Sequence, residues 1–160
     1  MCKRHIPKYR LLSIEELQNL EKEFISYLVI NGITNDDWEK FKIQNKSKTT
    51  EITSLFSDVV FEKIMRNAKY LLKIEATAIF AFKCDDTQIQ LVNIETSDES
   101  YDFTVPESLG SLKSNPPSDL KGYSATKEYK QVRELEIFSM IQNGCNISDH
   151  LWYDTLLKML

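Results

Sequence analysis

Glycine is scarce and scattered in this sequence, which has only 4 glycines, at positions 32, 110, 122 and 144. Loops that cradle phosphates, and the turns that present hydrolase nucleophiles, need glycines at short fixed spacings. The sequence accordingly contains no GxGxxG, GxxxxGK[ST] or GxSxG motif, and HExxH and CxxC are also missing. These absences disfavour the common nucleotide-binding, hydrolytic and metal-dependent sites, and we assign no catalytic residue and no cofactor.

Cysteine is also rare, and long apolar runs are missing. The 3 cysteines, Cys2, Cys84 and Cys145, are odd in number and far apart, which is not the pattern of a disulfide framework. No stretch approaches the roughly 20 apolar residues that span a bilayer, and the start MCKRHIPKYRLLSIEEL lacks the apolar run of a secretion signal. We therefore expect a cytoplasmic protein with reduced thiols and no membrane contact.

Ordinary globular composition fills the rest of the chain. Of its 160 residues, 42% are hydrophobic and 28% are charged, enough apolar surface for one core, so we expect a single domain over 1–160. The formal net charge of -4 provides no overall attraction to nucleic acid or to anionic lipid. A protein is therefore the default partner, and the oligomeric state has no signal in the sequence.

Helical signals dominate the first part of the chain. Ser13 and Glu16 form a capping-box pattern, and the apolar residues that follow recur at helical spacing until Gly32. This predicts one helix over about 13–31. A shorter helix should follow Thr34 or Asn35. A third, starting at Thr49 or Thr50, has a broad apolar face, on which we expect three side chains to be deeply buried: Phe56, Val59 and Val60.

The pattern changes after residue 69. The runs YLLKIE, AIFAFKC and IQLVNIE are rich in β-branched and aromatic residues and are separated by short turns, which predicts a three-stranded antiparallel meander. Residues 96–125 are rich in Ser, Asp, Glu and Pro and predict a long acidic loop. A helix from Ser124 or Thr126 to Gly144, and another capped by Ser148, complete an α+β fold in which this helix pair covers one face of the sheet.

Four residues near the two ends of the chain are possible metal ligands. Cys2, His5, Cys145 and His150 include both histidines, and two thiolates with two imidazoles suit tetrahedral zinc. The spacings are not those of a zinc finger, and Cys2 lies where chains usually fray. Buried cysteines and surface histidines are the more ordinary interpretation, so a small metal-dependent protein or enzyme is an alternative reading only.

The N-terminal arm, residues 1–12, is basic on an otherwise acidic chain. Lys3, Arg4, Lys8 and Arg10 are interleaved with aromatic and imidazole rings, a composition that can contact RNA or an acidic protein surface. Clusters of this size are more often solvated tails. An RNA-associated or ribosome-associated protein that uses this arm is therefore a second alternative.

A turn that combines acidic and aromatic residues precedes the second helix. Asp36 and Asp37 lie where carboxylates favour the positive end of a helix dipole, and Trp38 follows them. Adjacent acids at such a position usually serve as caps, whereas an exposed tryptophan can anchor a protein partner. We include these three residues as a candidate partner-binding site.

Several motifs resemble those of an uncharacterised family of small cytoplasmic proteins from Bacteroidota. They are the KYR segment that leads into a Glu-rich helix, the NGI-x-x-DDW turn, the FSDVVFEK helix and the closing stretch RELEIFSMIQNGCNISDHLWYDTLLKML. Together they span most of the chain. The resemblance implies a shared lineage and an intact domain, but no reaction.

These observations favour a non-enzymatic interaction module, an adaptor or accessory subunit of a larger intracellular assembly. Four features motivate this expectation: the missing catalytic motifs, the basic arm, the acidic and aromatic turn at residues 36–38, and the long loop over 96–125, which as a mobile segment would suit binding.

Overall fold

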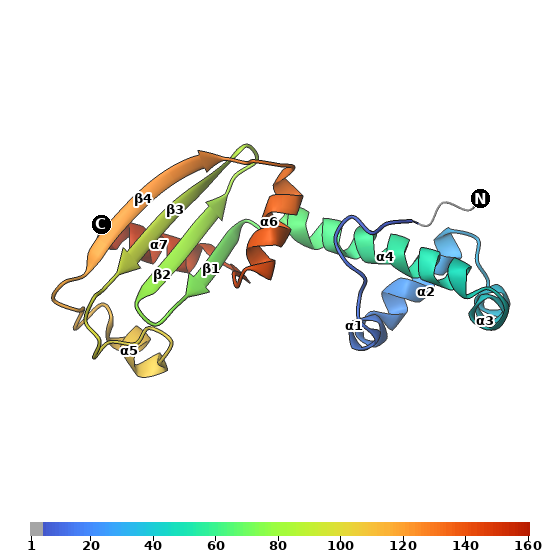
Figure 1. Ribbon diagram of the computed structural model, residues 1–160, viewed down its shortest axis with the longest axis horizontal. Coiled ribbons are helices and arrows are strands. Elements are labelled where there is room, and N and C mark those ends of the chain that lie inside the picture. The colour runs from blue at the N-terminus through green and yellow to red at the C-terminus, as the bar shows by residue number, and fades with distance from the viewer. Residues whose placement is uncertain (1–4) are drawn as a thin grey trace. The chain divides into compact units, whose positions relative to one another are not determined.

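The computed structural model describes residues 5–160, and its contacts divide the chain into two compact units, Met1–Ile64 and Met65–Leu160. We call these the N-terminal unit and the C-terminal unit. The described residues form seven helices and five strands, which confirms the α+β class (Figure 1). The single domain expected from the sequence stays a prediction.

The N-terminal unit is helical. It contains α1 (Ile14–Asn19), α2 (Glu21–Ile30), α3 (Asn35–Gln44) and most of α4 (Lys46–Asn67). The expected capping box at Ser13 and Glu16 is present, but the predicted single helix over 13–31 is wrong, because Leu20 leaves helical geometry with φ -109° and ψ 23°. The start predicted for the third helix is also wrong. The side chain of Asn45 accepts a hydrogen bond from the backbone N–H of Lys48 at 3.1 Å, and the helix begins at Lys46.

Aromatic rings fill the core of the N-terminal unit. The Phe24 ring lies 5.0 Å from both the Trp38 ring and the Phe56 ring, and Tyr27 lies 5.3 Å from Phe56. Phe56 is buried as predicted, but the expected burial of Val59 is wrong, because that side chain is 54% exposed. The expected deep burial of Val60 is also wrong, since its side chain is only partly buried.

The C-terminal unit is built on a five-stranded antiparallel sheet with the order β4-β3-β2-β1-β5. The predicted meander is confirmed as β1 (Tyr70–Ile74), β2 (Ala78–Cys84) and β3 (Gln88–Glu95). The prediction of only three strands is wrong, because β4 (Lys121–Glu128) pairs with β3 and β5 (Asn146–Ser148) pairs with β1. Their sequences lack the apolar alternation by which we identified the other strands.

The segment predicted as a long loop over 96–125 is more ordered than expected. It contains α5 (Pro106–Ser111) and the first five residues of β4, and the ring of Phe103 is fully buried. The predicted helix start at Ser124 or Thr126 is wrong, because both residues pair with β3 and α6 (Arg133–Gln142) begins later.

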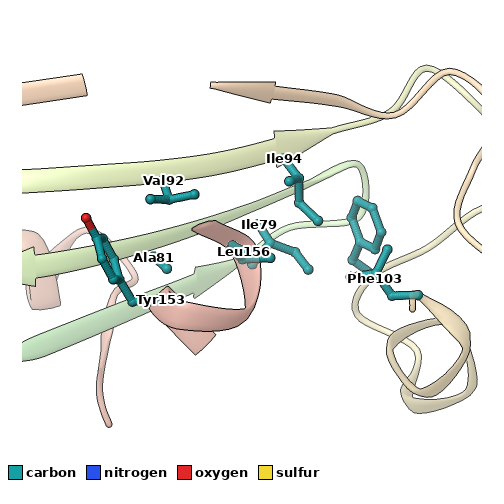
Figure 2. Close-up of a cluster of buried hydrophobic side chains, with 8 residues drawn as sticks. Ile79, Ala81, Val92, Ile94, Phe103, Tyr153 and Leu156 are labelled. Atoms are coloured by element: carbon teal, nitrogen blue, oxygen red, sulfur yellow. The ribbon is translucent and has the colours of Figure 1, made fainter. Parts of the chain in front are cut away.

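The main core of the C-terminal unit lies between the sheet and α7 (His150–Met159). Ile79, Ala81, Val92 and Ile94 from the sheet pack with Tyr153 and Leu156 from α7 and with Phe103 (Figure 2). The predicted cover of one face by both C-terminal helices is wrong. Side chains alternate between the faces of a strand, and α6 lines a groove with Phe80 and Phe82, so α6 lies on the face opposite α7.

Candidate interaction groove

The face of the sheet opposite α7 has only partial cover. Phe80 and Phe82 alternate along β2 with the buried Ile79 and Ala81, and both phenylalanines are only partly buried. Between this face and α6 lies a groove of about 460 Å³. We call it the α6 groove, and its lining residues are Lys73, Phe80, Phe82, Lys127, Lys130, Gln131, Glu136, Ser139, Met140, Asn143 and Cys145.

The guanidinium of Arg133 holds the start of α6 in place. It donates hydrogen bonds to the backbone oxygens of Met65 at 3.0 Å and Ala68 at 2.6 Å, at the end of α4, and of Cys84 and Asp85, each at 3.1 Å, at the end of β2. Its planar fork of five N–H donors suits several acceptors at once. One side chain therefore joins three elements and sets one wall of the groove.

Basic groups surround the apolar floor of the α6 groove. Lys73, Lys127 and Lys130 contribute three ammonium groups, against a single lining carboxylate, Glu136. Lys73 pairs with Glu75 outside the groove at 2.9 Å, and Lys127 pairs with Glu136 at 3.0 Å. Positive groups therefore outnumber negative ones here, on a chain whose formal net charge is -4.

Glu136 stays ionised although only 6% of its surface is exposed. Burial alone would raise its pKa, but hydrogen bonds outweigh burial and lower the pKa below its ordinary value. The donors are the Lys127 ammonium at 3.0 Å and the backbone N–H of Lys130 at 2.6 Å. The carboxylate thus ties the turn after β4 to α6 and is already satisfied by the protein's own donors.

Cys145, in the groove wall, and nearby Cys84 are both free and buried. Burial raises the pKa of Cys145 and raises the pKa of Cys84 to about 11. Because the thiolate is the nucleophile and metal-binding form, both groups behave as small apolar side chains at neutral pH. The chemistry that the groove offers is apolar contact at its floor and positive charge at its rim.

The acidic and aromatic residues predicted to bind a partner lie at the first turn of α3. Asp37 and Thr34 form a capping box, and the Trp38 ring meets Phe24 edge-on. Trp38 is partly buried and Asp36 is exposed. Asp37 and Trp38 therefore have structural partners within the N-terminal unit, and their role in binding stays a prediction.

The described part of the basic arm makes ion pairs and does not resemble a solvated tail. The Lys8 ammonium lies 2.8 Å from Glu62, and the Arg10 guanidinium lies 2.7 Å from Glu16. The backbone N–H of Lys8 also donates to Asp58 at 2.9 Å. Lys8 and Arg10 thus form ion pairs within the N-terminal unit. Lys3 and Arg4 lie outside the described residues.

Both histidines among the candidate metal ligands have other partners. His5 lies in the N-terminal unit, with Nε2 2.8 Å from Asp58, and His150 lies in the C-terminal unit, with Nδ1 2.9 Å from Asp154. Cys145 is buried, and Cys2 lies outside the described residues. Over residues 5–160, no cluster of three or more His, Cys, Asp and Glu side chains is arranged to hold a metal ion.

Sequence reasoning missed the residues of the α6 groove. The alternation in AIFAF places Ile79 on one face of β2 and Phe80 and Phe82 on the other, which was a usable signal. It could not show which face would stay open, because that depends on where α6 and α7 pack.

An α+β fold with a helix on each face of a five-stranded antiparallel sheet defines the C-terminal unit. The chain belongs to a Family of unknown function (DUF6495), which it matches over residues 7–160. No curated protein and no solved structure matches the chain. None of the helices in the described part of the chain is both long enough and apolar enough to cross a membrane.

Proposed function

We propose that this protein is a non-enzymatic interaction module, an adaptor or accessory subunit of a larger intracellular assembly. The α6 groove is its docking site, and the partner contributes a short protein segment that carries a bulky apolar side chain beside carboxylates. The observation that carries the proposal is the partly exposed aromatic floor of Phe80 and Phe82 beneath a rim of lysines.

The floor of the groove supports the apolar half of this proposal. Phe80, Phe82 and Met140 all line the groove, and aromatic and Met side chains are enriched at the cores of protein interfaces. A groove of about 460 Å³ accommodates one or two large side chains and cannot enclose a folded domain. A short segment of a protein partner therefore fits better than a whole folded surface.

The rim supports the acidic half of the proposal. Because Lys127 pairs with Glu136 and Lys73 pairs with Glu75, the ammonium of Lys130 leaves the groove with a surplus of positive charge. Complementary charge steers encounter and selects among partners more than it adds affinity. We expect binding to weaken as salt increases, as it does for exposed charge pairs.

A cytoplasmic location and a Bacteroidota lineage belong to the same proposal. Cys84 and Cys145 are free and buried, a state that suits a reducing compartment. The family-like motifs of the sequence support the lineage. RNA binding through the arm is the weaker candidate, because Lys8 and Arg10 already pair with Glu62 and Glu16.

The test is affinity purification of the tagged chain at native expression level, with mass spectrometry and sizing of what co-elutes. Lys130→Glu reverses one charge at the rim, and Lys113→Glu, an exposed lysine outside the groove lining, is the matched control. We expect a stoichiometric partner with the native chain and with Lys113→Glu, and roughly tenfold less with Lys130→Glu. A partner retained equally by both variants, or no stoichiometric partner at all, would overturn the proposal.

A further inference from the structure

The β4 strand is an unprotected edge of the sheet. It occupies one end of the strand order, spans eight residues, and each of these residues is exposed. It contains no proline, and its pairing with β3 runs without interruption from Lys121 to Glu128. A long, regular, open edge is a template for another strand, and proteins usually disrupt such an edge.

The hydrogen-bond pattern shows which backbone groups of β4 face outward. Asp85 N–H donates to Gln88 O across a directly opposed pair, so the even-numbered residues of β3 bond β2 and the odd-numbered ones bond β4. The β4 partners of those odd residues are Lys121, Tyr123, Ala125 and Lys127. The N–H and C=O groups of Gly122, Ser124, Thr126 and Glu128 therefore point to the open edge.

We propose that two copies of this chain pair through β4, antiparallel and about a twofold axis at Ala125. Only registers that oppose two outward-facing residues can form the ladder, and two of them pair seven of the eight residues. One is centred on Ser124 and places Lys121 opposite Lys127 of the second copy. The other is centred on Ala125 and avoids that repulsion, so charge selects it.

Side chains in the Ala125 register are complementary. Lys127 of each copy lies opposite Tyr123 of the other, which allows the ammonium to contact the aromatic ring. Glu128 lies opposite Gly122, beside which the side chain of Leu160 packs, and Ser124 lies opposite Thr126. Lysines on an edge strand usually prevent self-association, but in this register Lys127 has an aromatic partner rather than another cation, and Lys121 lies outside the seven paired residues.

Gly122 is also required within one copy. The side chain of Leu160 occupies the space that a Cβ at Gly122 would need, so the end of the chain packs closely against the start of β4. Leu160 is 51% exposed and lies beside the proposed interface. The second copy would therefore meet a backbone edge flanked by apolar surface.

The proposed pairing joins two five-stranded sheets into one continuous ten-stranded sheet. Because the twofold axis of an antiparallel ladder runs perpendicular to the sheet, both α6 grooves would open on the same side. A partner with two docking segments could then bind both copies at once and gain avidity. The pairing itself does not depend on what the groove binds.

Disulfide trapping tests the register. In a Cys2→Ser background, Ala125→Cys places two thiols across the axis in a non-hydrogen-bonded pair, about 4.5 Å apart between Cα atoms, close enough to bridge. The two remaining cysteines are buried. We expect rapid dimer formation under mild oxidation with Ala125→Cys and at least tenfold slower formation with the matched Ser124→Cys. Equal rates, or faster linkage at Ser124, would overturn the proposal.

Sizing tests the pairing without added cysteines. We expect the native chain to sediment as a dimer at about 0.1 mM, and Ser124→Pro, which removes one outward N–H but none that bonds β3, to sediment as a monomer. The thermal midpoint of Ser124→Pro should stay within a few degrees of native when both are compared as monomers at high dilution. A native monomer at about 0.1 mM, or a Ser124→Pro chain that still dimerises, would refute the pairing.

Discussion

The two faces of the sheet in the C-terminal unit carry similarly apolar side chains but bury them to different extents. Along β2, Ile79 and Ala81 are buried beneath α7, whereas Phe80 and Phe82, which are larger, are only partly buried. The exposed face is thus no less apolar than the covered one. Burial here depends on which helix covers a residue more than on the hydrophobicity of that residue.

The two helices cover the sheet to different extents. α7 places Tyr153 and Leu156 in the main core, against β2 and β3 (Figure 2). α6 is held at one end by Arg133, where Leu71 and Ile89, on the same face as Phe80, are fully buried. The main core beneath α7 and the groove available for binding therefore lie on opposite faces, and substitutions can distinguish them.

The largest effect should come from the covered face. Leu156→Ala removes a fully buried side chain from the main core and should reduce the free energy of unfolding by about 2 to 5 kcal/mol. Leu157→Ala, at a neighbouring position that is 47% exposed, is the control and should cost less than about 1 kcal/mol. Denaturant titration measures both, and equal losses would contradict the comparison.

Loss of the Arg133 guanidinium should loosen the packing of α6 on the face of the sheet that carries Phe80 and Phe82. Arg133→Ala removes the guanidinium from four carbonyl oxygens, of which Asp85 O keeps the Tyr129 hydroxyl and Met65 O keeps the backbone N–H of Ala68. It should reduce the free energy of unfolding by about 2 to 4 kcal/mol. It should also speed the reaction of Cys84 and Cys145 with a thiol reagent, because both lie near α6. Arg133→Lys should rescue little, since an ammonium lacks the guanidinium fork. Unchanged thiol reactivity would show that Arg133 does not position α6.

A substitution on the open face should affect binding more than folding. Phe80→Ala removes a partly buried ring and should cost about 1 to 2 kcal/mol of unfolding free energy. Ile79→Ala, the adjacent residue on the covered face, should cost about 2 to 4 kcal/mol. Pull-down at native expression level should show partner loss with Phe80→Ala and retention with Ile79→Ala. The reverse pattern would place the binding surface elsewhere.

The smallest effect concerns the pH dependence of stability. Because the pKa of Glu136 is lower in the folded chain, its stabilising contribution is fully present above the unfolded value of about 4.3 and is lost as pH falls through the lowered pKa. Glu136→Gln should cost about 1 kcal/mol at neutral pH and should flatten the acid decline of the unfolding free energy. An unchanged slope in acid would show that Glu136 is not the group responsible.

Local signals in the sequence predicted local structure well. Ser13 with Glu16 and Thr34 with Asp37 do form capping boxes, and Gly32 has the positive φ of 71° expected after a helix. The β1–β3 meander was also predictable, because sequential strands joined by short turns pair with their neighbours. Each of these features depends on residues close together in the chain.

Features that depend on distant partners were not predictable in this way. KGYSATKE has no apolar alternation, and β4 exists because β3 supplies its ladder. Asn146–Ser148 similarly becomes a strand only against β1. The ion pair of Lys8 with Glu62 and the packing of Trp38 on Phe24 likewise join residues that are far apart in the chain. The sequence therefore predicted a loop and a helix start where β4 lies, and a solvated tail where Lys8 and Arg10 lie.

Capping chemistry, turn residues and apolar periodicity act within a few positions of one another, so the chain alone specified its α+β class, the starts of α1 and α3 and the central meander. The cap predicted for the last helix at Ser148 is wrong by one residue, because Asp149 caps α7. Packing decided the rest. Only the assembled C-terminal unit shows that α7 covers one face of the sheet, that Arg133 holds α6 over part of the other, and that β4 is an open edge. The α6 groove follows from these long-range contacts, which side-chain alternation along a strand cannot assign to one face or the other.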